Sequence, residues 1–274
     1  MQVGFLTACV RNWSLEECVA FASKTGFDAL EIHMGHLPAE KALAEDADIR
    51  ELFANNGLAI SSIAAYSNLL DPDADKRKAN VEMMKQYVDA CVAVGTDVLC
   101  ALAGMPIPGK SKEETIAAEF KEVFAPITEY AADKGVKIAF ENYFVTLIGN
   151  FDQWDAVIDA VPMPNLGFNY DPSHLIWQGI DYLAGVDRYA DRIFHTHAKD
   201  TEIRHDRLAM CGNQNNRGWW RYVIPGFGSI EWGKYVARLR KAGFDGVMSI
   251  EHEDNTFTPE EGLEKGLANL RLLA

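Results

Sequence analysis

Apolar residues recur along the chain in two alternating patterns. Segments with apolar positions three and four residues apart end near a glycine, and a short apolar or β-branched run follows each of them. The first such segment, residues 14–26, opens with Ser14 and Glu17 at capping-box spacing and closes at Gly26. An apolar run over 27–33 comes next. The pattern therefore predicts a helix over 14–26 followed by a strand over 27–33.

The same alternation continues to the end of the chain. It predicts eight strands, at residues 3–8, 27–33, 58–65, 96–104, 136–142, 166–171, 192–200 and 247–254, and a last helix over 259–274. Eight strands that alternate with helices in about 250 residues favour a parallel (β/α)8 TIM barrel. A doubly wound open sheet is the main alternative, but the sequence lacks its glycine-rich phosphate loop. No linker-like stretch divides the chain, so we expect one α/β domain over 1–274.

Residues 201–228 depart from this repeat. They follow the seventh predicted strand and show no clear period. A connection of this length is usually functional or disordered. The stretch contains Trp219, Trp220 and Tyr222, which is not the composition of a disordered segment. We therefore expect an ordered insert at about 201–228.

Composition excludes several classes of protein. The formal net charge is −14, from 40 acidic and 26 basic side chains, so the surface repels nucleic acid and anionic membranes at long range. The five cysteines form no C-x-x-C pair, which is typical of reduced thiols. The chain begins without signal-peptide features and contains no apolar run of about 18 residues. We expect a cytoplasmic protein with no nucleic-acid or membrane partner.

Four predicted strands carry, near their carboxyl ends, a residue of a type that can bind a metal. These residues are Glu141, Asp171, His197 and Glu251. In a TIM barrel those ends meet at the active site, and a divalent cation is the simplest way to hold three carboxylates there together. Each residue alone also has an ordinary role, as a solvated strand end, a turn residue before Pro172 or a buried histidine. From spacing alone, both interpretations stay open.

The stretch "FHTHAKD" (194–200) belongs to the seventh predicted strand. Because side chains alternate along a strand, His195, His197 and Lys199 point to the same side, which the barrel makes its interior. His197 lies nearer the carboxyl end and is the expected ligand. His195 lies one layer deeper, where we expect a core or supporting residue, and Lys199 lies beyond the ligand.

Several motifs resemble those of the xylose-isomerase-like barrels over essentially the whole chain. They are "FENY" (140–143), "NYDPSH" (169–174), "HTHAKD" (195–200), "PGFGSIEW" (225–232) and "SIEHE" (249–253). This family includes sugar isomerases and epimerases, inosose isomerases and dehydratases, ketose 3-epimerases and endonuclease IV.

The resemblance implies a metal-dependent sugar enzyme. It implies one divalent ion, expected to be Mn²⁺ with Mg²⁺, Co²⁺ and Zn²⁺ as alternatives, bound by Glu141, Asp171, His197 and Glu251. Glu141 and Glu251 would be the catalytic acid and base on opposite faces of the substrate. They would act through a metal-stabilised enediolate, in an isomerase or epimerase of a sugar, sugar phosphate or inosose-type ketone.

Five further residues are candidates for substrate binding. By the resemblance, His174 and Lys199 would bind hydroxyl or carbonyl oxygens, although Lys199 also fits a structural ion pair. His33 shares a face with Glu31 and would reach the pocket unless it is an ordinary buried histidine. Trp177 and the stretch around Arg221 would contact a sugar, or else pack the insert or form a dimer contact. "PGFG" (225–228) is a candidate anion-binding loop.

Other functions stay open at this point. The known ketose 3-epimerases carry a further acid and an arginine after the fifth-strand glutamate, and "ENYFVTLIGN" (141–150) has neither. The main alternative is a metal-dependent lyase or dehydratase acting on keto-sugars or 3-keto-glycosides. An abasic-site endonuclease is disfavoured by the negative charge, and a non-catalytic carbohydrate-binding barrel is a further alternative. The expected partner is a small-molecule carbohydrate, with homo-oligomer formation left open.

Overall fold

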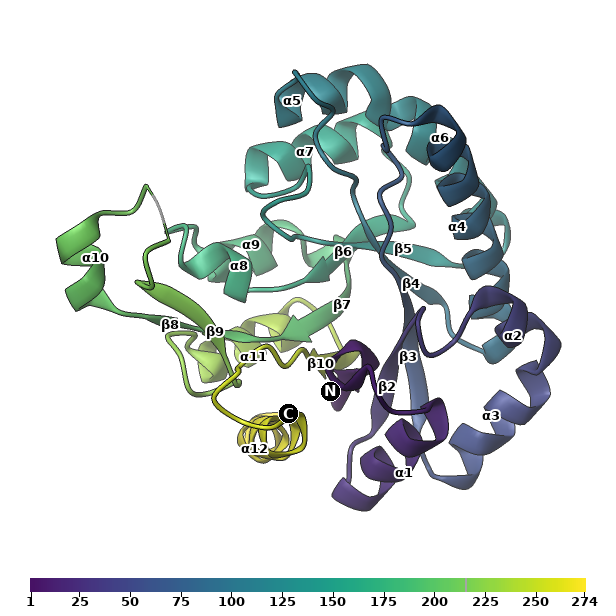
Figure 1. Cartoon of the computed structure of the whole chain (residues 1–274), viewed down its shortest axis with the longest axis horizontal. Coiled ribbons are helices and arrows are strands. Elements are labelled where there is room, and N and C mark those ends of the chain that lie inside the picture. Colours follow the sequence, from purple (N-terminus) through teal and green to yellow (C-terminus); the bar gives the residue numbers. More distant parts are fainter. Residues whose placement is uncertain (215) are drawn as a thin grey trace.

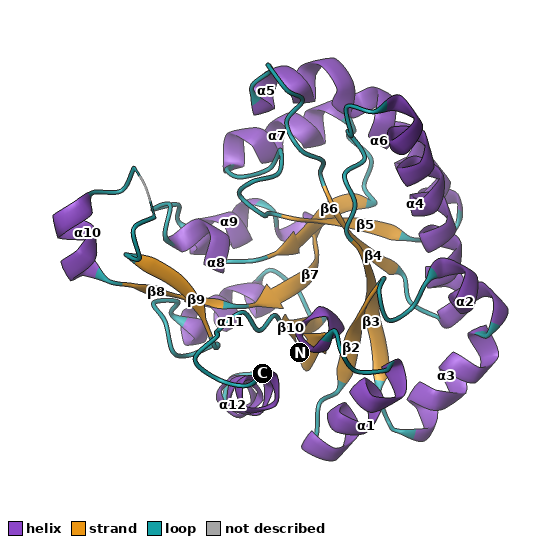
Figure 2. Ribbon diagram, in the orientation of Figure 1, coloured by secondary structure: helices purple, strands orange, loops and turns teal. Residues whose placement is uncertain are grey.

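The computed structural model describes residues 1–214 and 216–274. Eight parallel strands close into a barrel in the order β1-β10-β7-β6-β5-β4-β3-β2, with helices around it (Figure 1, Figure 2). The barrel strands are β1 (Gln2–Leu6), β2 (Ala29–His33), β3 (Ala59–Ala65), β4 (Val98–Leu102), β5 (Lys137–Glu141), β6 (Leu166–Tyr170), β7 (Ile193–Ala198) and β10 (Val247–Ile250). Each of the eight predicted strands is confirmed, and so is the TIM barrel.

Most helices lie outside the barrel between successive strands; the exceptions are one helix within the insert and the last helix of the chain, which follows the last strand. The helices are α1 (Leu15–Thr25), α2 (Ala39–Ala44), α3 (Asp46–Asn55), α4 (Ala74–Val94), α5 (Lys112–Thr115), α6 (Lys121–Asp133), α7 (Phe151–Ala160), α8 (Ser173–Ile176), α9 (Tyr182–Arg188), α10 (His205–Cys211), α11 (Trp232–Lys241) and α12 (Pro259–Arg271), with short helical turns η1 (Thr7–Val10), η2 (Ile116–Phe120) and η3 (Ala190–Arg192). Within the described residues, no helix is both long and apolar enough to cross a bilayer.

The ends of α1 follow directly from its sequence. Ser14 Oγ accepts a hydrogen bond from the backbone N–H of Glu17 at 3.1 Å, and the Glu17 carboxylate accepts one from the N–H of Ser14 at 2.7 Å. These two bonds satisfy backbone donors that the helix leaves without partners. Gly26 ends the helix with φ of 89°, a left-handed conformation that glycine adopts without steric cost. The predicted capping box is confirmed.

Two different environments surround the barrel strands. A large apolar core lies between barrel and helices, and all five residues of β6 are buried because parallel strands are covered on both faces. A second apolar cluster, all of it on barrel strands, consists of Leu6, Ala64, Val98, Cys100 and Ala139. These mostly small side chains share the barrel with buried polar residues such as Glu31, Asn169 and His195. The barrel interior therefore contains both small apolar side chains and buried polar ones.

Two register shifts lie next to polar residues of the barrel. The β2–β3 pairing shifts between Leu30 and Glu31, and the β6–β7 pairing shifts between Phe168 and Asn169. A β-bulge changes the direction of the side chains that follow it and is frequent beside active sites. These shifts help set where Glu31 and Asn169 lie inside the barrel.

The insert at 201–228 is ordered in its described residues, although its sequence shows no periodicity. β7 ends at Ala198, earlier than predicted, and β8 (Asp200–Ile203) begins after a single residue. β8 pairs in antiparallel fashion with β9 (Trp220–Val223), and α10 lies between them, so this hairpin extends away from the barrel (Figure 1). The hairpin carries Trp220 and Tyr222 back toward the barrel opening.

Asp200 joins the hairpin to the following loop. Its Oδ2 accepts hydrogen bonds from the N–H groups of Gly226 and Gly228 at 3.0 Å each and from Trp232 Nε1 at 2.8 Å. Its Oδ1 accepts from the N–H groups of Thr201 at 2.7 Å and Ile230 at 3.0 Å. The amides of the candidate anion loop "PGFG" are therefore directed at an internal carboxylate.

Replacement of Asp200 by asparagine should destabilise the fold. The amide nitrogen cannot accept hydrogen bonds, so buried N–H groups lose their acceptor. We expect a loss of about 2–4 kcal/mol in the free energy of unfolding. Denaturant unfolding measures it, with Asp206→Asn on exposed α10 as a control that should change stability by less than about 0.5 kcal/mol. Equal stability of the two variants would contradict this role of Asp200.

Candidate metal centre

The four predicted ligands meet at the carboxyl end of the barrel. Glu141 ends β5, Asp171 follows β6, His197 lies on β7 and Glu251 follows β10. One ligand atom from each lies within 4.8 Å of the others. Asp171 and His197 are completely buried, and Glu251 exposes 14% of its side chain. Four separate strand ends thus form one buried cluster.

This cluster fits a divalent cation. His197 Nδ1 and Asp171 Oδ2 are both buried and make no hydrogen bond, although Glu251 Oε2 lies 3.2 Å from Nδ1 and Lys199 Nζ lies 3.2 Å from Oδ2 as charged neighbours. Buried polar atoms are otherwise almost always hydrogen-bonded, so two such atoms in one cluster point to a missing partner. Three carboxylates and one imidazole are suitable donors for Mn²⁺, Mg²⁺, Co²⁺ or Zn²⁺. Their role as metal ligands stays a prediction, and the geometry supports it.

Two basic side chains balance the acidic charge. Lys199 Nζ lies 2.5 Å from Glu251 Oε2, 3.2 Å from Asp171 Oδ2 and 3.4 Å from Glu253 Oε2. Burial lowers the pKa of Lys199, but these carboxylates outweigh it and raise the pKa well above the usual range. His197 Nδ1 lies 3.2 Å from Glu251 Oε2. Lys199 is therefore a charged part of the site.

The two predicted catalytic carboxyls are ionised in this setting. Burial raises the pKa of Glu141, but the neighbouring His174, His197 and Lys199 outweigh it and hold the pKa well below its usual range. Burial likewise raises the pKa of Glu251, and the charge of Lys199 outweighs it, so the net pKa is lowered. At neutral pH both groups are in the carboxylate form, which can accept a proton or bind a metal.

Glu31 supports His197 from the side opposite the cluster. This buried carboxylate on β2 lies 3.0 Å from His197 Nε2. Burial raises the pKa of Glu31, but the charges of His197 and His195 bring it down to about 2. The carboxylate therefore stays ionised and accepts a hydrogen bond from the N–H at Nε2, which leaves Nδ1 directed at the other predicted ligands. Such carboxylate–histidine pairs orient the histidines that bind metals.

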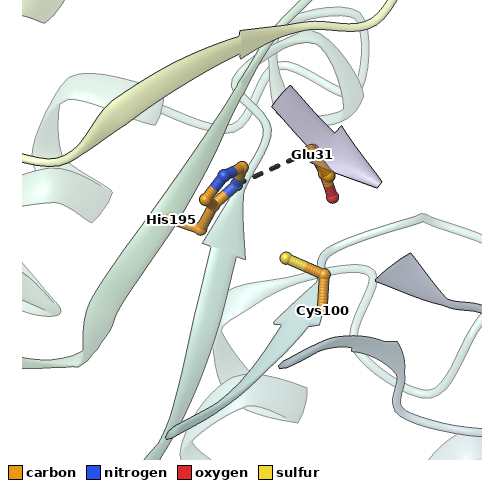
Figure 3. Close-up of side chains that lie close together, drawn as sticks. All are labelled: Glu31, Cys100 and His195. Carbon is orange, nitrogen blue, oxygen red and sulfur yellow. Dashed lines mark ion pairs between the residues drawn. The ribbon is translucent and has the colours of Figure 1, made fainter. Parts of the chain in front are cut away.

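A second group of ligand-type side chains lies deeper in the barrel. Glu31, Cys100 and His195 come within 4.8 Å of one another, from three different strands (Figure 3). Both ring nitrogens of His195 already have polar partners, Asn169 Oδ1 and Ser61 Oγ, each at 3.1 Å. Burial raises the pKa of Cys100, so its thiol stays protonated. This group is satisfied without a cation and supports the layer above, as expected for His195.

His174 is held in place by the hairpin. Its Nε2 lies 3.3 Å from Glu141 Oε1 and 3.3 Å from Lys199 Nζ, and its Nδ1 lies 2.6 Å from the Tyr222 hydroxyl. Burial raises the pKa of Tyr222, so the phenol keeps its proton and can donate a hydrogen bond to Nδ1. The hairpin thus fixes the orientation of an imidazole next to the predicted catalytic carboxylate.

A cavity of about 410 Å³ opens above the cluster. Its lining residues are Tyr66, Leu102, Glu141, Tyr143, Phe144, His174, Lys199, Trp220, Tyr222, Glu251 and Glu253. Two of the predicted metal ligands, Glu141 and Glu251, thus line the same cavity as the predicted substrate-binding residues His174 and Lys199.

The other predicted substrate-binding residues do not line this cavity. His33 Nδ1 accepts a hydrogen bond from the N–H of Gly35 at 3.0 Å. Arg221 pairs with Glu202 at 2.6 Å and Asp254 at 2.7 Å, which ties β9 to the loop before α12. Trp177 stacks on Trp220, which does line the cavity. Contacts of His33, Arg221 and Trp177 with a substrate stay predictions.

Sequence reasoning missed several members of the site. Tyr222 was considered only as part of the aromatic insert, and Tyr66 and Glu31 were not candidates. Tyr66 directly follows β3, so its place at a strand end was a usable signal. Glu31 lies on the same face of β2 as His33. Its partner His197 is 166 residues away, and no local pattern indicates that contact.

The chain matches a known protein family over most of its length. Residues 19–273 match the Xylose isomerase-like TIM barrel family, and the chain belongs to it. An inosose isomerase of Bacillus velezensis is 25% identical over 257 residues, covering 92% of this chain and 86% of the relative. An inosose dehydratase of Geobacillus thermodenitrificans is 24% identical over 261 residues, covering 88% and 83%.

A solved structure shares the fold of this chain. The structure of the IOLI protein with a binding zinc atom superposes with a TM-score of 0.80 at 22% identity, covering 100% of this chain and 98% of that one. At this level of identity the likeness shows the shared fold. The isomerase and the dehydratase are about equally similar to this chain, so the similarity does not choose between their activities.

Metal binding is the first property to test. Apo protein titrated with Mn²⁺ should bind about one ion per chain, and an ion present at about 100 times its Kd should add about 2.7 kcal/mol to the stability. His197→Ala should weaken binding by more than about 100-fold, the upper end of the effect of losing a supporting partner. His205→Ala on exposed α10 is the matched control. Full metal content in His197→Ala, by elemental analysis, would disprove the ligand assignment.

Glu31→Gln tests the supporting carboxylate. Because the neutral amide no longer holds the proton on His197 Nε2, we expect metal affinity to fall by about 10–100-fold in a calorimetric titration. Glu40→Gln, an exposed substitution in α2, should leave the affinity unchanged. If both variants bind metal like the parent, then Glu31 does not orient His197.

Proposed function

We propose that this chain is a divalent-metal-dependent isomerase or epimerase of a sugar-like hydroxy ketone. The observation that carries the proposal is the position of Glu141 and Glu251. They reach one cavity from the non-adjacent strands β5 and β10, and both belong to the cluster that fits a metal. Membership of a family whose relatives include inosose isomerases supports this substrate class.

The chain's own residues account for a proton transfer at carbon. A bound divalent ion would polarise the substrate carbonyl and stabilise the negative charge that develops beside it. One of the ionised pair Glu141 and Glu251 accepts the proton from the carbon next to the carbonyl and so becomes the glutamic acid that can return it. Return of that proton to the neighbouring carbonyl carbon, with transfer of the hydroxyl proton to the former carbonyl oxygen, gives isomerisation. Epimerisation requires the other glutamate first to take up a proton from water, deliver it to the opposite face of the same carbon, and leave the first glutamate to lose its proton to water.

Neighbouring groups would hold the substrate oxygens. Lys199 is positively charged and His174 has a fixed orientation, and both line the cavity next to the carboxylates. An ammonium group close to the carbonyl oxygen stabilises an oxyanion as it forms. We therefore assign Lys199 and His174 to substrate binding and oxyanion stabilisation.

A lyase or dehydratase is the second candidate. The similarity to an inosose dehydratase nearly equals the similarity to an inosose isomerase. Both reactions begin with removal of the same proton. In the lyase the electron pair of that C–H bond then expels a hydroxyl or another group from the next carbon.

Deuterium exchange distinguishes the two reactions. We expect protein supplied with Mn²⁺ in D2O to place deuterium beside the carbonyl of an inosose, a ketohexose or a 3-keto-glucoside, detected by NMR. Uptake without loss of a group supports the isomerase, whereas release of water or an aglycone supports the lyase. Glu251→Gln should slow exchange by at least about 100-fold.

The controls separate catalysis from metal binding. Metal content of Glu251→Gln is measured in parallel, and Glu260→Gln on the exposed surface of α12 should exchange like the parent. If every candidate ketone binds but none exchanges, the chain is a carbohydrate-binding barrel and the proposed enzyme activity is wrong.

The five cysteines are free thiols, which favours a reducing compartment, and we propose the cytoplasm.

A further inference from the structure

One wall of the cavity is aromatic. Phe144, Trp220 and Tyr222 line it, and the Trp177 ring is stacked on Trp220 with centroids 4.5 Å apart and planes 10° apart. Phe144 stands edge-on to Trp177 at 5.0 Å and to Trp220 at 6.2 Å. Trp220 is therefore supported from one side in a fixed orientation. A rigid, partly exposed aromatic surface of this kind is a binding platform for a flat ring.

This wall is continuous with the metal centre. Tyr222 contacts His174 through its hydroxyl, and Lys199 Nζ lies 4.5 Å from the centre of the Tyr222 ring. Trp220 packs next to Tyr222 with ring centroids 5.0 Å apart. A molecule bound at the carboxylate cluster therefore reaches Trp220 within the same cavity.

The charge of the cavity argues against an anionic group on the part of a ligand that lies next to Trp220. Among the described residues that line it, Lys199 is the one lysine or arginine, and it is already paired with Asp171, Glu251 and Glu253. The loop that the sequence offers as an anion site does not supply free donors either. The backbone N–H groups of Gly226 and Gly228 in this loop donate hydrogen bonds to Asp200. A phosphate would thus meet carboxylates and aromatic rings instead of free cations.

We propose that the substrate carries an uncharged aromatic ring in addition to its keto-sugar end, and that this ring stacks on Trp220. This inference rests on the proposed function, because it places the sugar end at the metal centre. The substrate class is then a neutral glycoside with an aromatic substituent and not a sugar phosphate. The hairpin β8–β9, which supplies Trp220 and Tyr222, is the element that determines this preference.

Equilibrium binding to the Mn²⁺-supplied protein tests the inference without turnover. The probes are methyl β-D-glucopyranoside, phenyl β-D-glucopyranoside, cellobiose and glucose 6-phosphate. We expect the phenyl compound to bind about two- to tenfold tighter than the methyl compound, the range that one aromatic stacking contact contributes. Glucose 6-phosphate should bind no tighter than the methyl compound.

Variants locate the effect. Trp220→Ala should remove the preference for the phenyl compound, and Trp220→Phe, which keeps a ring, should retain most of it. Phe227→Ala removes an exposed aromatic side chain outside the cavity and should keep the full preference. Thermal unfolding checks that each variant is folded, and if Trp220→Ala fails to fold, Trp220→Leu takes its place.

The outcomes are distinct. Equal binding of the phenyl and methyl compounds, no measurable binding of the phenyl compound, or tightest binding of glucose 6-phosphate overturns the inference. Tighter binding of cellobiose than of the phenyl compound also overturns it, because the wall then accepts a second sugar. Deuterium exchange without phenyl preference leaves the proposed function intact. Phenyl preference with metal bound but no exchange on any ketone overturns the function and not the subsite.

Discussion

The structure depends on holding three carboxylates and an imidazole within 4.8 Å of one another in a buried site. Each buried charge left without compensation costs several kcal/mol, so the surrounding residues must supply positive charge. Lys199 does so through its contacts with Asp171 and Glu251, and a divalent ion would do so more completely. The buried Glu31 in turn orients His197. Much of the polar interior of the barrel follows from this one electrostatic requirement.

Four consecutive residues at the end of β7 each have a different role. His197 faces the metal cluster, Ala198 ends the strand, Lys199 compensates the carboxylates and Asp200 binds the loop at 226–232. Because Asp200 also begins β8, the same stretch that builds the centre anchors the hairpin. The hairpin then returns with Tyr222 against His174. The predicted metal centre and the aromatic wall are therefore both attached to one short segment of the chain.

Much of the fold and the centre of the site could be predicted from local pattern. The capping box at Ser14 and Glu17 and the eight apolar runs are local features, and the barrel follows from their alternation. The cluster of Glu141, Asp171, His197 and Glu251 could be predicted because the barrel brings the carboxyl ends of its strands to one face. Arg221 illustrates the opposite case. It is adjacent in sequence to two residues of the cavity wall, yet it points to Glu202 and Asp254 because side chains alternate along β9.

The sequence by itself determined the element order, the barrel and the residue types at the strand ends, because each depends on neighbours only a few positions away. Only the tertiary structure decided how the ligands are supported. Glu31 meets His197 across 166 positions after a register shift in β2, and Tyr222 meets His174 across 48 positions through a hairpin whose sequence shows no period. Such contacts depend on strand register and on the path of an insert. Those are set by packing of the whole molecule, which local periodicity does not encode.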